Sequence, residues 1–125
     1  MLENKFTQHD KIVVDKFHDP VANYTMSVRD YVLRPRANAI TGPITITLPP
    51  VSEAKGRFYS ILVREADVTN TITITDNNGD SECWLYDVEL WDSCQAMLWY
   101  SDGLYWHMLG ALKFIFDVIF GKPQL

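Results

Sequence analysis

The sequence lacks any run of basic residues, and its formal net charge is −5. Binding of nucleic-acid phosphates needs a basic face, so we do not expect nucleic acid as a partner. The sequence also lacks a long apolar run. The longest, residues 112–120, is interrupted by Lys113 and Asp117 and is far shorter than the roughly 20 residues of a membrane-spanning helix. We therefore expect no membrane partner.

Signals for export and oxidation are also missing. The N-terminal residues 1–6 show no basic segment leading into an apolar one, which a secretory signal peptide would have. We expect the protein to be made in the cytoplasm of its host cell. The two cysteines, Cys83 and Cys94, are too few for a disulfide scaffold. Without an export signal, the favoured interpretation is two buried, reduced thiols.

The sequence carries none of the short motifs of zinc sites, phosphate-binding loops or serine-hydrolase nucleophiles. An oxygen-rich stretch at 76–82 resembles the start of a calcium loop, but its glycine and last glutamate are misplaced for that role. Ser101, Asp102 and His107 suggest a catalytic triad, but the first two are neighbours in a segment typical of a tight turn. We expect no enzymatic activity, no metal and no cofactor.

The dominant pattern is an alternation of apolar residues with period two, rich in threonine, isoleucine, valine and aromatics, which is typical of half-buried strands. Prolines 49 and 50 end the first such segment, because proline cannot donate to a sheet. Regular strand spacing without helical crossovers predicts an all-β fold, a single β-sandwich or jelly-roll-like domain. The expected strands are residues 44–48, 57–64, 71–75, 82–90, 96–100 and 104–109.

Three regions differ in pattern. Residues 1–40 are less regular and are interpreted as an extended N-terminal arm or edge region, in which 11–15 and 23–28 could form short strands. Residues 41–110 form the expected β-sandwich core. Residues 111–125 form an apolar C-terminal tail, whose spacing fits either a helix or a strand. An exposed segment of this kind would be prone to aggregation, so its aromatic residues are interface candidates. These are Phe114, Phe116 and Phe120.

The segment 96–109 predicts a β-hairpin, because Asp102 and Gly103 between two apolar runs favour a tight turn with positive φ at the glycine. A two-residue loop would pair Trp99 with Trp106, and a three-residue loop would shift the pairing by one. In either register both faces carry aromatics, which is more apolar surface than a small monomer easily hides. A subunit interface is favoured over a sugar-binding platform. The candidates are Trp99, Tyr100, Tyr105 and Trp106.

Four segments follow one another in a specific order. They are Ile-Thr-Ile-Thr-Leu-Pro-Pro at 44–50, Ala-Lys-Gly-Arg-Phe-Tyr-Ser-Ile at 54–61, Thr-Ile-Thr-Ile-Thr at 71–75, and Tyr-Ser-Asp-Gly at 100–103 followed by Trp106. In this order they resemble a recurring trimeric β-domain of tailed-bacteriophage fibres and head-decoration proteins. The resemblance spans 44–109 and leaves out the arm and the tail.

The resemblance implies a bacteriophage virion structural protein located in the virion. It would be a homotrimeric capsid decoration (cement) or short head-fibre subunit, and the short chain favours decoration over a long tail fibre. Its partners would be its own copies and other virion proteins, such as the major capsid protein. The alternative is a host-recognition or carbohydrate-binding module of a phage tail fibre, with host surface glycans stacked on exposed aromatic side chains.

Overall fold

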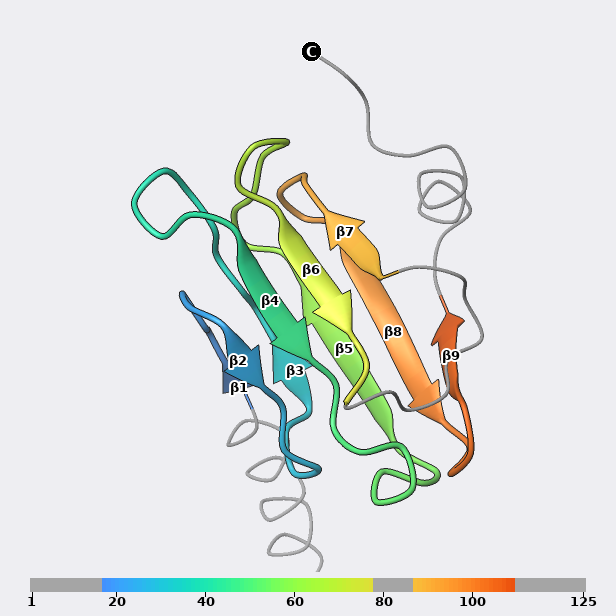
Figure 1. Ribbon diagram of the computed structural model, residues 1–125. Coiled ribbons are helices and arrows are strands. Elements are labelled where there is room, and N and C mark those ends of the chain that lie inside the picture. Colours follow the sequence, from blue (N-terminus) through green and yellow to red (C-terminus); the bar gives the residue numbers. More distant parts are fainter. Residues whose placement is uncertain (1–16, 78–86, 110–125) are drawn as a thin grey trace, which may run out of the picture.

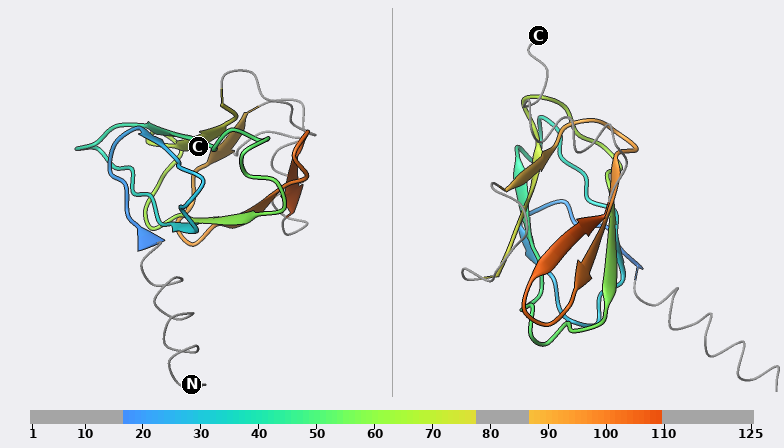
Figure 2. Two further views of the ribbon diagram at one scale, coloured as in Figure 1. Left: turned by 90° about the horizontal axis from the view of Figure 1, so that it is seen from below. Right: turned by 90° about the vertical axis from the view of Figure 1, so that its right-hand side faces the viewer.

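The computed structural model describes residues 17–77 and 87–109, which form two β-sheets facing each other as two layers (Figure 1 and Figure 2). Sheet A contains, in order, β1 (Phe17–His18), β3 (Val32–Leu33), β5 (Phe58–Leu62), β8 (Ala96–Ser101) and β9 (Trp106–Leu109). Sheet B contains β2 (Tyr24–Thr25), β4 (Ile44–Thr47), β6 (Ile72–Thr75) and β7 (Val88–Leu90). The expected all-β fold is confirmed.

From β1 to β6 the chain alternates between the two sheets, so that odd-numbered strands join sheet A and even-numbered strands join sheet B. Within each sheet these strands are parallel. Two successive strands therefore make one turn of a flattened coil, and the next two stack on it. The last strands reverse direction: β7, β8 and β9 are antiparallel to β6, β5 and β8. Period-two alternation occurs in both kinds of sheet, so the sequence does not predict the parallel pairing.

The two Ile-Thr-Ile-Thr segments, β4 and β6, are neighbours on successive turns of this coil. They pair in parallel register, with Ile44 opposite Ile72 and Thr45 opposite Thr73. The isoleucines are buried and the threonines are half-buried on the outer face. The likeness of the two segments is that of similar strands in one sheet, because they occupy neighbouring places in sheet B.

Side chains from both sheets meet in one buried core. Sheet A contributes the largest ones, and the ring of Trp106 lies edge-on against that of Tyr59 with centroids 5.7 Å apart. Burying one large apolar side chain stabilises a fold by roughly 1.5–3 kcal/mol. The other buried apolar residues are Met26, Leu33, Ala37, Ile44, Ile46, Leu48, Val51, Ala54, Ile61, Val63, Ile72, Ile74, Val88, Leu90, Met97 and Trp99.

The region expected as an N-terminal arm or edge contributes three strands. In the described part of the sheets, β1 and β2 are outermost, whereas β3 lies between β1 and β5. Met26 and Leu33 belong to the core. Residues 17–40 are therefore part of the same two-layer fold as residues 41–77 and 87–109. The expected strand at 11–15, most of the one at 82–90 and the tail 111–125 lie outside the described residues.

Candidate functional site

Two of the segments that carry the phage-domain resemblance, 54–61 and 100–103, meet at one end of the domain, where β8 turns into β9. The Gly56 N–H donates to the Ser101 carbonyl oxygen at 2.7 Å. The Ser101 hydroxyl is buried, donates to the Val51 carbonyl oxygen at 2.6 Å and accepts from the Gly103 N–H at 3.1 Å. The stem of Lys55 lies so close to Gly103 that an added Cβ would come within 2.9 Å of it. The turn at Lys55 and Gly56 and the hairpin turn at 102–105 are therefore in direct contact and bonded to each other.

Asp102 closes the hairpin loop. Its Oδ1 accepts hydrogen bonds from the backbone N–H groups of Leu104 and Tyr105 at 2.8 and 2.7 Å, and its Oδ2 lies 2.8 Å from Nε2 of His107. These hydrogen bonds lower the pKa of Asp102 to about 2. The bond to His107 has the largest effect, and the two bonds from the backbone follow. Gly103 has φ +94°, so the predicted turn and its positive φ are confirmed.

Both predicted hairpin registers are wrong. Ser101 pairs with Trp106 and Tyr100 pairs with His107, which leaves a four-residue loop at 102–105. The physical reason is the side chain of Asp102, which satisfies two loop N–H groups and so stabilises a longer loop than a two- or three-residue turn.

The triad pattern does not assemble into a reactive arrangement. In an antiparallel pair, opposite residues share a face, so Ser101 lies on the inner face with Trp106, while His107 lies on the outer face with Tyr100. The Ser101 hydroxyl is committed to a backbone carbonyl in the core. Among the described residues, no cluster of three or more His, Cys, Asp or Glu side chains could hold a metal ion.

The interface candidates divide between core and surface. Trp99 and Trp106 are fully buried, which corrects their assignment to a binding surface. Both residues face inward from the hairpin, and their indole rings pack in the core between the two sheets. Tyr100 is half-buried on the outer face, and Tyr105 in the loop is 47% exposed. Phe114, Phe116 and Phe120 lie outside the described residues.

Cys94 also departs from expectation, because it is an exposed free thiol rather than a buried one. It lies in the turn between β7 and β8 with φ +69°, and its N–H donates to the Val63 carbonyl oxygen at 2.9 Å. The turn geometry, which directs the side chain outward, overrides the usual preference of cysteine for the core. Cys83 lies outside the described residues.

An apolar patch covers the outer face of sheet A, and no sequence pattern singled it out as a unit. Phe58 is opposite Tyr100, which is opposite His107, and the Phe58 and Tyr100 rings lie 4.7 Å apart by centroid. Leu98 lies between Ser60 of β5 and Leu109 of β9. We define the apolar patch as Phe58, Leu62, Leu98, Tyr100 and Leu109, of which the first three and the last are 36–46% exposed.

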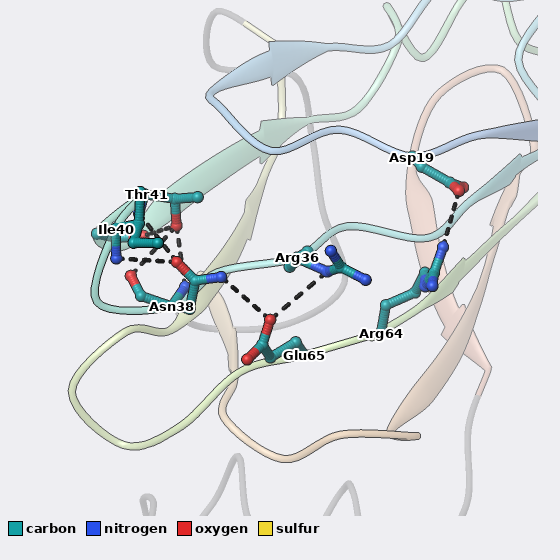
Figure 3. A network of polar contacts seen from close by, with 8 residues as sticks. Asp19, Arg36, Asn38, Ile40, Thr41, Arg64 and Glu65 are labelled. Carbon is teal, nitrogen blue, oxygen red and sulfur yellow. Dashed lines mark hydrogen bonds and ion pairs between the residues drawn. The ribbon is translucent and has the colours of Figure 1, made fainter.

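A cluster of charged residues continues this outer face toward β1 and the segment after β3 (Figure 3). Asp19 accepts two hydrogen bonds from Arg34 at 2.9 Å and one from Arg64 at 3.0 Å. Burial alone would raise the pKa of Asp19, but the bonds and charges of the two arginines outweigh it and lower that pKa. Next to them, Arg36 pairs with Glu65 at 3.5 Å. We define these five residues as the charged rim.

The outer face of sheet B differs in character. Two rows of threonines cross it, one with Thr45 opposite Thr73 and one with Thr25, Thr47 and Thr75 side by side on three strands. The Thr75 hydroxyl donates to the Asp87 carboxylate at 3.0 Å. This threonine face is polar, whereas the patch on sheet A is apolar.

Comparison of the chain with protein-family models, with curated proteins and with solved structures finds no match. Within residues 17–77 and 87–109, no helix has the length and apolar character needed to cross a membrane.

Proposed function

We propose that the chain is a non-enzymatic structural protein of a tailed-bacteriophage particle, a homotrimeric capsid decoration (cement) or short head-fibre subunit. The observation that carries this proposal is the apolar patch on sheet A. Monomeric proteins rarely leave contiguous large apolar side chains in water, and such patches mark interaction surfaces. The patch spans β5, β8 and β9, so it is presented on a paired sheet rather than on a loop.

The aromatic members of the patch add to its suitability for binding. Phe58 and Tyr100 of the patch form a row across three strands with His107, which borders the patch, and successive ring centroids lie 4.7 and 6.2 Å apart. Tyrosine and phenylalanine are enriched in the cores of protein interfaces, because they bury a large area at low entropic cost.

The order of segments that resembles the phage domain gives the proposal its biological class. In this chain two of those segments are in contact: the Gly56 N–H, in the turn before β5, donates to the carbonyl oxygen of Ser101 at the start of the Ser-Asp-Gly turn. Buried Ser101 and the capped loop after it make a compact end to the domain. A particle component under mechanical load benefits from such short, internally bonded turns.

Two measurements on the full chain test this function. Analytical ultracentrifugation should give a stable homotrimer, about three times the 14.4 kDa of one chain, at micromolar concentration. Purified protein added to phage particles that lack it should sediment with them and raise the temperature at which they release DNA. A stable monomer that leaves the particles unchanged would contradict the proposal.

A second candidate function is glycan binding in a tail-fibre module, favoured by the exposed tip of the β8–β9 hairpin. Leu104 is 71% exposed and Tyr105 is 47% exposed in this loop. An exposed tyrosine ring can stack on a sugar face. Binding to a bacterial glycan array that is lost in Tyr105→Ala, with the oligomeric state unchanged, would favour this function over decoration.

A further inference from the structure

The two outer faces of the domain differ so strongly that they point to different roles. We infer that the apolar patch and charged rim of sheet A form the surface through which copies of this chain associate, and that the threonine face of sheet B stays turned away from the assembly contact. This inference rests on the proposed self-association and names the surface responsible for it. Among the members of that surface, the hairpin pattern in the sequence pointed to Tyr100 alone.

The outer face of sheet A has the composition of a subunit interface. Its middle is apolar, with Leu98 between Ser60 and Leu109, and the charged rim lies to one side of it. Interfaces typically combine an apolar centre that excludes water with a polar border that sets orientation. Leu98 is 37% exposed at the centre of three adjacent strands, which is where residues that dominate binding energy tend to lie.

Charge favours a second copy as the occupant of this face. The chain carries a net charge of −5, so two copies repel each other over most approaches. The charged rim is an exception, because it has three arginines against two carboxylates and so a local excess of one positive charge. It also presents both signs side by side, so the rim of one copy can offer partners to the rim of another. The same face is therefore apolar at its centre and carries at its rim a small positive excess that favours an acidic copy.

The threonine face lacks both properties. Thr45 and Thr73 are half-buried and present hydroxyl and methyl groups in place of large apolar side chains. The nearby charges are the carboxylates Asp87 and Glu89, with Glu89 directly opposite Thr73. Two such faces would bring negative charges together without apolar area to offset the repulsion. The threonine face is thus suited to contact with water.

A pair of matched substitutions separates the two faces. Leu98→Lys places a charge on the outer side of β8, which lies between β5 and β9, and Thr73→Lys does the same on β6, which lies between β4 and β7. Both side chains point outward from interior strands, and lysine at position 73 faces Glu89, so neither change buries a charge in the core. Circular dichroism and thermal melting establish that each variant is folded. Phe58→Lys, at a residue 46% exposed, is a second patch variant in case Leu98→Lys does not fold.

Sedimentation velocity over a concentration series then gives the result. We expect the patch variant to dissociate, with its association constant reduced by about tenfold or more, and Thr73→Lys to assemble like the wild type. If the wild type is trimeric and the patch variants remain trimeric, the inference is overturned while the proposed function stands. If a patch variant stays trimeric but no longer binds particles, the patch contacts another virion protein, and the inference of self-association through it is also overturned. A wild type that is monomeric contradicts the proposed function itself.

Discussion

Gly103 offers a direct test of how the hairpin turn is held. Its φ of +94° is a conformation that favours glycine, and a Cβ built there lies 2.9 Å from both Cγ and Cδ of Lys55. Gly103→Ala should therefore destabilise the fold in two ways. The backbone term is about 1–2 kcal/mol, because Cβ crowds the following carbonyl at positive φ. Displacing the Lys55 stem into a strained rotamer adds about 0.5–1.5 kcal/mol.

Two controls separate these contributions. Gly42 has φ +72°, and no atom lies within 4 Å of the position that the Cβ of an alanine would take there, so Gly42→Ala should show the backbone term alone. Lys55→Ala removes Cγ and Cδ, so Gly103→Ala should cost less in that background than in the wild type. The difference between the two backgrounds is the coupling energy of a double-mutant cycle.

Urea and thermal unfolding at one fixed protein concentration provide the measurement, because association would otherwise change the midpoint. A loss of 1 kcal/mol corresponds to a shift of roughly 3–6 °C for a domain of this size. A melting temperature unchanged in Gly103→Ala would refute the left-handed turn. An effect that is identical with and without the Lys55 side chain would refute the contact but not the turn.

Three further predictions concern the same end of the domain and its core. Ser101→Ala should lower the free energy of unfolding by about 1–3 kcal/mol, measured in urea, because a buried hydroxyl that bonds the Val51 carbonyl and the Gly103 N–H is removed. Asp102 has a folded-state pKa lowered to about 2 from 3.8, so its stabilisation is present above pH 4 and is lost as the pH falls from about 4 through 2; acid unfolding of Asp102→Asn should lack this component. Tyr59 has its pKa raised to about 12 by burial, so its stabilisation is present below pH 10 and is lost as the pH rises through 12. The pKa of Tyr24 is also raised to about 12, mainly by burial, so ultraviolet titration of Tyr59→Phe should retain the late ionisation of Tyr24 and lose that of Tyr59.

Much of the strand content could be predicted from the sequence, because alternation directly reports which side chains face a core. The strands at 44–47, 72–75 and 96–101 fall within a residue of their expected bounds. Of the short strands β1, β2 and β3, only β2 lies within an expected strand, the one at 23–28. Each has two residues, which is too few to show a period, and their pairing depends on the coil that later strands complete.

The alternation pattern could predict only part of the candidate site. The sequence pointed to the 96–109 hairpin, but it could not say which aromatics face the core, because both faces carry them. The apolar patch is assembled from the β8–β9 hairpin and from β5, which is distant from it in sequence, with Phe58 about forty residues from Tyr100. Whether Phe58 and Leu62 face inward or outward depends on the burial of Tyr59 and Ile61 between them. That choice is made by the packing of the two sheets rather than by local pattern.

The hairpin shows why the face on which a side chain lies is easier to predict from sequence than the register in which two strands pair. Successive side chains of a strand alternate between faces, so a register shift of two residues leaves every side chain on the same face, whereas a shift of one would reverse the pairing of inner with outer positions. The observed pairing of Ser101 with Trp106 differs by two from the two-residue-loop register, in which Trp99 would oppose Trp106. Trp99 and Trp106 therefore still share the inner face, and Tyr100 still lies on the outer one. The core tolerates either of these registers by alternation alone, and the Asp102 carboxylate, through its two bonds to loop N–H groups, favours the one observed.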